Sequence, residues 1–416
     1  FVTKTAQNNS DVRNYQSINM LYLEVLKNRN FTYLLIGNFL RRSCFVLFSL
    51  QIIWFTVELT NQSSLKLSMM VMSQTLPFII FGIFGGAYSD KHNKKKILYL
   101  SDLILSLIII IIPLLAITSN LNYLTLLTIS TAITIINCYT DPAFRAILPE
   151  IIDEEHLATS NALIDSLQRG SNIILPALIG VIVILVGNVG VFFICSILLF
   201  LGFIFNALLK YTNNNMIDRH SKEDFSETWE FLKQSKEIPF IIIIQFACIL
   251  INTGLWRVVL PLFISNILKE GVGVYGLATS CLGIASLLMS LIMGLLSEKR
   301  LIFKFSIGVL VWGIGLSIIN VFPSVAILYI GATLLGLGQS IEGLTRSVAI
   351  QIKTPNHLMG KVFSISSTSN YAADTLSLGL ISIIIPLLSL SNIFILGGVI
   401  ISILSLAGLK FVKKSM

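Results

Sequence analysis

Four arginines of this sequence lie inside long apolar runs, where charged side chains are rare. Arg41 and Arg42 lie well inside the first run, Arg169 lies in the fifth, and Arg257 lies in the seventh. A charge in hydrocarbon is costly, so such residues by default mark either a pathway or a paired structural site. Because the planar guanidinium fork binds a carboxylate through two hydrogen bonds, this many arginines favour an anionic, carboxylate-rich ligand.

Substrate binding is the first role that we assign to these arginines. Arg41 and Arg42 point about 100° apart on a helix and cannot face one partner, so we expect one of them to line a cavity. Arg257 follows polar and aromatic residues on a segment that suits a substrate wall better than lipid. The predicted substrate-binding residues are Arg41, Arg42, Arg169, Asn252, Trp256 and Arg257.

Two acids in the same runs are candidates for proton coupling. Asp165 stands one helical turn before Arg169 on the same face, so pairing within the helix and a role in a cavity are equally open. Asp374, in the middle of the eleventh run, is the best single acid for the role, and pairing with one of the arginines is its alternative. We therefore predict proton coupling at Asp165 and Asp374.

The elements that must position these residues are helices that cross a membrane. The chain of 416 residues is 55% hydrophobic and 12% charged, whereas roughly 25% of the residues of a soluble domain are charged. Its apolar runs of about 20 residues are each long enough to cross a hydrocarbon core of ~30 Å. The alternating ten-residue segments of a membrane barrel are absent from the sequence. We predict an all-α membrane protein with twelve transmembrane helices.

Very short connections on one side and one long polar stretch in the middle divide the runs into two bundles of six helices. Within the long stretch, Phe225, Trp229 and Leu232 share one face of an amphipathic helix. A regulatory domain is the alternative for this stretch. The predicted parts are a cytoplasmic N-terminal segment (1–30), the first bundle (31–210), the linker (211–237), the second bundle (238–412) and a cytoplasmic tail (413–416).

An internal repeat supports this division. Asp141 and Arg145 recur as Glu342 and Arg346, and a Gly-x-x-Ser-Asp-Lys segment near residue 90 recurs near residue 298 with Glu in place of Asp. We expect two pseudo-symmetric halves with a site at their interface. In the first half Asp90 and Arg145 can pair as a gating latch, with Asp141 one turn from Arg145, and Glu298, Arg346 and Glu342 can repeat this in the second half. The predicted latch residues are Gly86, Asp90, Lys91, Asp141, Arg145, Glu298, Glu342 and Arg346.

The net charge of +8 comes from basic residues in the short segments between apolar runs. Their bias to one side predicts that both termini are cytoplasmic in a multi-pass cell-membrane protein. Nucleic-acid binding is not expected, because no basic motif with interleaved aromatic residues occurs. The four histidines and five cysteines lack metal-ligand spacing, so we expect no metal, no cofactor and no enzyme. The expected partners are a small-molecule substrate, a proton and the lipid bilayer, and the expected state is a monomer.

One motif gives the sequence a family resemblance. The segment Gly86-Ala87-Tyr88-Ser89-Asp90-Lys91-His92-Asn93-Lys94-Lys95 resembles the major facilitator signature between the second and third spans. Asn93 stands where that family usually has Gly, and we attribute this to the ease with which Asn adopts positive φ. The resemblance implies a secondary transporter with the major facilitator fold.

Two further segments narrow the resemblance to a branch that contains siderophore exporters and macrolide efflux proteins. They are Asp141-Pro142-Ala143-Phe144-Arg145-Ala146-Ile147-Leu148-Pro149-Glu150 and Trp229-Glu230-Phe231-Leu232. In the fifth span, Leu175-Pro176-Ala177-Leu178-Ile179-Gly180 is similar to an antiporter motif, with Leu175 in place of its first glycine.

Three functions remain open at this point. Proton-coupled export of an anionic, carboxylate-rich siderophore by alternating access is the first prediction, because of the arginines and the branch resemblance. Efflux of macrolides or other drugs is the alternative, since an aromatic, apolar cavity suffices for it. A non-transporting membrane receptor or scaffold is the alternative from another class. Loss of Arg41, Arg42 and Arg257 is expected to abolish siderophore export but to spare a neutral or cationic drug.

Overall fold

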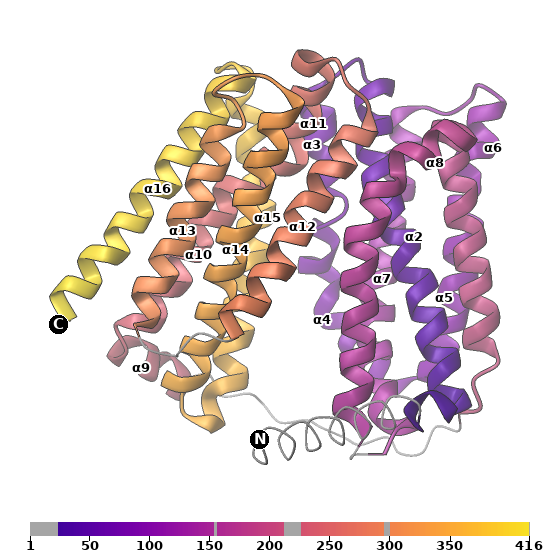
Figure 1. Cartoon of the computed structure of the whole chain (residues 1–416). Helices are drawn as coiled ribbons and strands as arrows, with labels where there is room; N and C mark the ends of the chain where they lie inside the picture. Colours follow the sequence, from indigo (N-terminus) through magenta and orange to yellow (C-terminus); the bar gives the residue numbers. More distant parts are fainter. Residues whose placement is uncertain (1–23, 154–155, 212–225, 295–299, 416) are drawn as a thin grey trace, which may run out of the picture.

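The computed structural model describes residues 24–153, 156–211, 226–294 and 300–415, and in these ranges it consists of helices and short connections (Figure 1). Polar side chains begin several of the helices, because a side-chain oxygen accepts hydrogen bonds from the free N–H groups of the first turn. Asn28, Ser63, Asn122 and Ser324 do so. The helices of the first half are α2 (Arg29–Leu59), α3 (Ser64–Met72), α4 (Leu76–Lys91), α5 (Lys94–Ile109), α6 (Ile111–Ile117), α7 (Tyr123–Ile151) and α8 (Leu157–Ala207).

The second half is preceded by the short helix α9 (Ser226–Gln234). Its first span is a continuous segment, Glu237–Leu268, in which α-helical and π-helical stretches alternate. The helices of the second half are α10 (Glu237–Gly254), η2 (Leu255–Val259), α11 (Leu260–Phe263), η3 (Ile264–Leu268), α12 (Val272–Gly294), α13 (Leu301–Ile318), α14 (Val325–Lys353), α15 (Asn356–Ile384) and α16 (Leu390–Ser415).

Ten segments of the described chain are long and apolar enough to cross a membrane. One of them, Thr159–Ala207, has 49 residues, which at ~1.5 Å per residue would reach ~74 Å, more than twice a hydrocarbon core of ~30 Å. Gly187 breaks it with φ 74° and ψ 169°, so α8 forms two spans joined by a tight turn (Figure 1). Division of α8 at Gly187 turns the ten segments into eleven. The more polar helix α15 is the twelfth helix of the described chain that is long enough to cross the membrane. The predicted all-α membrane fold is confirmed.

Two local details differ from the sequence predictions. Asn93 has φ −65° and caps α5 by accepting a hydrogen bond from Lys96 N, so it acts as a helix cap and not as a residue with positive φ. In α9, Trp229 and Leu232 line one hollow, as expected of residues on one helix face, and Phe225 lies outside the described residues. The helix α16 continues to Ser415, so most of the predicted tail is helical.

The two halves lie side by side, close together at one end and apart at the end where α9 lies (Figure 1). We call these the opposite end and the α9 end. Within the first half α8 packs on α2 and α5, and α4 packs on α7, while in the second half α13 packs on α14 and α16, and α10 packs on α15. The halves meet chiefly where α8 contacts α12 and where α3 contacts α15.

The contact between α8 and α12 depends on glycines that let the backbones approach. A Cβ atom on Gly180 would lie 2.8 Å from the Cα of Gly273, and one on Gly276 would lie 2.0 Å from the carbonyl oxygen of Pro176. Ser280 Oγ donates a hydrogen bond to the carbonyl oxygen of Ile173 at 2.6 Å. The segment that resembles an antiporter motif therefore forms the contact between the halves, which we call the seam. Small residues allow two helices in a membrane to pack closely in this way.

Replacement of Gly276 by Ala is expected to lower the stability of the folded protein by about 1–3 kcal/mol, as overpacking does, because the added methyl group collides with the backbone of α8. The matched control is Gly343→Ala in α14, where a Cβ atom meets nothing within 4 Å. Thermal unfolding in detergent micelles should give a lower midpoint for Gly276→Ala alone. Equal midpoints for the two variants would contradict the close seam.

Candidate functional site

A cavity of about 660 Å³ lies among α2, α7, the first span of α8 and the turn between α3 and α4, with Tyr371 of α15 as its contribution from the second half. Its wall combines charged groups with aromatic ones, including Phe45, Phe78 and Phe144. Its volume falls within the range of ~300–1,000 Å³ that is usual for small-molecule sites. The cavity can therefore hold a single drug-sized molecule.

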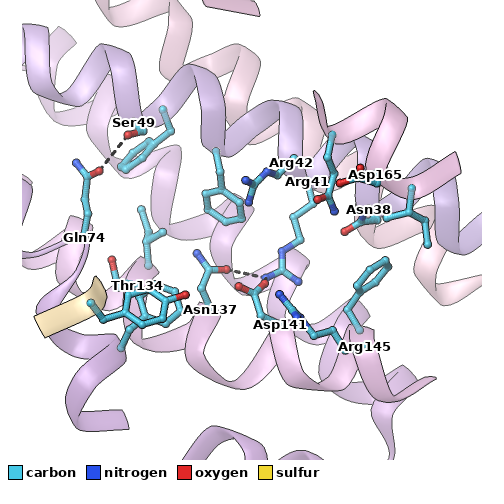
Figure 2. Close-up of a pocket in the computed structure, with 18 of the residues that line it drawn as sticks. Asn38, Arg41, Arg42, Ser49, Gln74, Thr134, Asn137, Asp141, Arg145 and Asp165 are labelled. Atoms are coloured by element: carbon cyan, nitrogen blue, oxygen red, sulfur yellow. Dashed lines mark hydrogen bonds and ion pairs between the residues drawn. The ribbon is translucent and has the colours of Figure 1, made fainter. Parts of the chain in front are cut away.

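Arg41 forms the centre of the charged wall (Figure 2). Its side chain is 7% exposed. Its Nη2 atom donates to Asn137 Oδ1 at 2.8 Å and to Asp141 Oδ1 at 3.0 Å, both on α7. Its Nε atom lies 3.8 Å from Asp102 Oδ1 on α5, an ion pair too long for a hydrogen bond. One guanidinium group thus faces two carboxylates.

Asp102 is a functional candidate that the sequence reasoning missed. Its side chain is fully buried, and its Oδ2 atom accepts a hydrogen bond from Asn206 Nδ2 at 2.7 Å. Gly37 and Gly202 leave the space for this pair, since a Cβ atom on Gly37 would lie 2.7 Å from Asn206 Oδ1 and one on Gly202 would lie 3.4 Å from Asp102 Oδ2. An acid inside the predicted third span was the signal that could have identified it.

The second half has a neutral residue in the corresponding place. Gly408 of α16 packs on Ser306 of α13 as Gly202 of α8 packs on Asp102 of α5. Ser306 Oγ donates to the carbonyl oxygen of Ile302 in its own helix at 2.8 Å. The fold therefore does not require a buried charge at this position, and Asp102 is specific to the first half.

Arg42 and Arg145 also line the cavity, and both side chains are exposed to it. Neither guanidinium group has a hydrogen bond or ion pair with another described residue. Figure 2 shows Arg145 beside Asp141, but Asp141 pairs with Arg41. The cavity wall thus contains two guanidinium groups that no described residue pairs with. Arg41 and Arg42 both line it, although the sequence led us to expect only one of them.

The predicted latch is realised differently in the two halves. In the second half Glu342 and Arg346 form an ion pair at 3.4 Å within α14, and Arg346 Nη1 donates to Ser366 Oγ at 3.4 Å. In the first half we expect Arg145 to pair with Asp90, whose side chain is outside the described part of the structure, and the neighbouring acid Asp141 pairs with Arg41 of another helix. Glu298 lies outside the described residues, and Gly86, Asp90 and Lys91 are described only as backbone of α4. Their gating role stays a prediction.

Asp165 and Arg169 pair within α8 at 2.7 Å, with side chains 58% and 60% exposed. This is one of the two alternatives for these residues, and Asp165 also lines the cavity. Its role in proton coupling and the role of Arg169 in substrate binding stay predictions.

The candidates of the second half do not line this cavity. Asn252 Oδ1 accepts a hydrogen bond from Trp312 Nε1 at 3.1 Å, and Trp256 packs against the main hydrophobic core. Arg257 Nη2 donates to Gln74 Oε1 at 2.7 Å, and Asp374 accepts a hydrogen bond from Thr253. These contacts occupy the groups that we predict to bind substrate or protons, and those roles stay predictions.

A polar cluster fixes the helix ends of the first half at the α9 end. Lys94 Nζ donates to Glu150 Oε1 at 2.9 Å, and Tyr211 donates its hydroxyl hydrogen to the other oxygen of Glu150. Burial and this hydrogen bond raise the pKa of Tyr211 well above its usual range. The tyrosine therefore remains a neutral donor throughout the physiological pH range.

Comparison with solved structures identifies the architecture. A transporter of the POT family in complex with a thioalcohol-conjugated peptide has a TM-score of 0.70, with 16% sequence identity over 93% of this chain and 96% of that one. A bacterial homologue of the iron transporter ferroportin in an inward-facing state has a TM-score of 0.70, with 14% identity over 91% of this chain and 98% of that one. The fold is that of the major facilitator transporters.

The sequence comparison identifies the family. The pattern of the family described as transmembrane secretion effector matches residues 23–410, and the chain belongs to this family of major facilitator secondary transporters. It is also similar to macrolide efflux protein A of Streptococcus pyogenes, with 30% identity over 126 residues, 30% of this chain. That alignment spans under a third of the relative's length, 31%. The chain is thus a multi-pass membrane transporter and not an enzyme.

Replacement of Arg41 by Gln should destabilise the protein by about 3–5 kcal/mol, because it leaves Asp102 buried without its counter-charge. Adding Asp102→Asn to this variant should restore much of the loss, since no buried charge remains. Arg42→Gln is the matched control, with an expected change within about 0.5 kcal/mol. Thermal unfolding of the wild-type protein, both single variants Arg41→Gln and Asp102→Asn, the double variant and the control gives the comparison. Additive losses in the double variant would rule out the coupling of Arg41 with Asp102.

Proposed function

We propose that this protein exports an organic anion by alternating access, with one molecule bound at a time in the cavity. The observation that carries the proposal is the pair of guanidinium groups of Arg42 and Arg145 in the cavity wall, neither of which forms an ion pair with a described residue. Guanidinium groups bind carboxylates through two parallel hydrogen bonds, and a cavity with low-dielectric walls strengthens that attraction. The aromatic side chains beside them favour an amphiphilic anion over a small inorganic one.

The direction of transport rests on the orientation that the basic residues favour. Lysines follow α4 and begin α5 at the α9 end, as at Lys94, Lys95 and Lys96, and basic connections stay on the cytoplasmic side. We therefore assign the α9 end and both termini to the cytoplasm. In this proposal the cargo enters the cavity from the α9 end, the side on which an exporter loads it.

A carboxylate-rich siderophore is the cargo that combines these requirements best. Such a molecule is anionic, drug-sized and made inside the cell. Outward movement of one negative charge down a membrane potential of ~100 mV contributes ~2.3 kcal/mol, an accumulation of ~50-fold per charge. Export of an anion therefore draws on the membrane potential directly.

Macrolide efflux is the second candidate. It is favoured by the similarity to macrolide efflux protein A and by the exposed carboxylates of Asp141 and Asp165 in the cavity, which can attract a cationic amine. A non-transporting receptor or scaffold is the remaining alternative, and the absence of counterflow for every probe would favour it.

Asp102 is the best-placed carboxyl group for a coupling proton. It is fully buried, and it shares the single guanidinium group of Arg41 with Asp141. A carboxylate buried in a membrane-spanning segment is costly, and its counter-charge, the Nε atom of Arg41, lies 3.8 Å away, beyond hydrogen-bond distance. Asp165 and Asp374 were our predictions for this role, but Asp165 already pairs with Arg169 and Asp374 bonds to Thr253.

The variant Arg42→Gln/Arg145→Gln should lower the export of carboxyfluorescein, an amphiphilic anion, by about tenfold or more, since a hydrogen bond to a charged group contributes ~1.5–3 kcal/mol. Erythromycin export should be unchanged if the protein carries it. Uptake into inside-out proteoliposomes measures both compounds, and Lys269→Gln, a cation outside the cavity, is the matched control. Export of erythromycin alone by the wild-type protein would transfer the proposal to macrolide efflux.

Asp102→Asn should remove the dependence of carboxyfluorescein export on an imposed pH gradient while exchange of labelled for unlabelled probe continues, because exchange needs no net proton movement. Asp165→Asn is the matched control and should keep the dependence. Proteoliposomes with a clamped membrane potential and a varied pH gradient separate the two effects. The assignment fails if Asp102→Asn keeps the gradient dependence, and loss of the dependence in Asp165→Asn alone would move the proton site to Asp165.

A further inference from the structure

Arg257 is a cation inside the membrane-spanning segment Glu237–Leu268 that the proposed loading site does not use. Its Nη2 atom donates to the neutral side chain of Gln74 at 2.7 Å. No carboxylate in the described part of the chain forms an ion pair with it. Asp374 acts on it electrostatically from beyond ion-pair distance. A guanidinium group at this depth is costly without a counter-charge in direct contact, so its position favours contact with an anion at some stage of the transport cycle.

Gln74 separates Arg257 from the cavity. It lies in the turn between α3 and α4, lines the cavity, and accepts a second hydrogen bond from Ser49 Oγ at 3.0 Å (Figure 2). Arg257 itself does not line the cavity. The side chain of Gln74 therefore lies between the guanidinium group of Arg257 and the cavity.

The bond between Gln74 and Arg257 joins the two halves. Gln74 belongs to the first half, and Arg257 belongs to the second. A second bond of this kind runs from Gln62 Nε2 to Ser265 Oγ at 3.1 Å. Separation of the halves at the opposite end must break both bonds, because their partners move with different halves. Arg257 then loses its only hydrogen-bond partner among the described residues and faces the space that opens.

The backbone around Arg257 is also unusual. Arg257 lies in the π-helical stretch η2, and a second π-helical stretch, η3, follows after four residues of α11. Short π-helical stretches are less regular than the α-helix and occur often at functional sites.

We propose that Arg257 is a second anion subsite, closed by Gln74 in this structure and completed when the opposite end opens. The inference rests on the proposed function, because it takes the same class of cargo, an amphiphilic carboxylate. The anion is loaded at Arg42 and Arg145 from the α9 end and contacts Arg257 before release at the opposite end. Gln74 acts as a positioning residue that shields the guanidinium group while the opposite end is closed.

The experiment measures apparent affinity separately on each side. Carboxyfluorescein counterflow is recorded in proteoliposomes of defined orientation, with the probe presented either at the α9 end or at the opposite end. Arg257→Gln should raise the KM at the opposite end about tenfold, the loss of one charge-assisted hydrogen bond, and should leave the KM at the α9 end within about twofold. Arg257→Lys should restore part of the affinity, and Lys269→Gln is the matched control.

A cross-link tests whether access to Arg257 depends on opening of the opposite end. In a Cys281→Ser background the added pair Gln62→Cys and Ser265→Cys should form a disulfide that holds this end closed. Carboxyfluorescein added at the α9 end should still bind to the cross-linked protein, and Arg257→Gln should have no effect on that binding. A loss of binding at the α9 end on adding Arg257→Gln to the cross-linked protein would place Arg257 in the loading site and overturn the proposal.

The other outcomes are distinct. An unchanged KM at the opposite end in Arg257→Gln, or an equal loss of rate in both directions without a change in KM, overturns the subsite and leaves the proposed function in place. If the wild-type protein carries no carboxyfluorescein from either side, the proposed function fails, and the subsite fails with it.

Discussion

The structure of the first half depends on one buried cation, Arg41. Its guanidinium group connects α2 to Asn137 and Asp141 on α7 and to Asp102 on α5, and Asn206 of α8 holds the far side of Asp102. In a membrane protein, apolar contact between helices competes with equally apolar lipid, so close packing and polar contacts specify how the helices associate. The small residues Gly37 and Gly202 follow from this cluster, because a larger side chain at either position would occupy its space.

The two halves have the same arrangement of helices but different chemistry. The second half has Ser306 where the first has Asp102, and its acid Glu342 pairs with Arg346 in its own helix, whereas Asp141 pairs with Arg41 across helices. Arg145, one turn from Asp141, lines the cavity and forms no ion pair with a described residue. The repeated helix arrangement thus forms the two bundles, and the residues that differ between the two halves form the site.

The sequence predicted the helical spans well because length and apolar composition decide whether a segment can cross a membrane. Gly187 could be placed between two spans because a single helix of that length would exceed the bilayer. The partner of Asp141 could not be predicted, because its one-turn neighbour Arg145 and the distant Arg41 are equally suitable in sequence, and only packing brings Arg41 to within 3.0 Å. Asn93 shows the same limit, since a helix cap and a residue with positive φ favour the same amino acid.

The central claim is that an anion bound at Arg42 and Arg145 drives the change from the state open at the α9 end to the state open at the opposite end. Spin labels on paired exposed sites test it most directly, with Asp153→Cys and Gln351→Cys at the α9 end and Asn120→Cys and Val321→Cys at the opposite end, each pair in a Cys281→Ser background. Pulsed electron resonance on the protein in nanodiscs then gives the two distance distributions. Saturating carboxyfluorescein should shorten the distances at the α9 end and lengthen those at the opposite end, and Arg42→Gln/Arg145→Gln should abolish both changes. Distances that do not respond to the anion, or that respond equally in the double variant, would contradict the account.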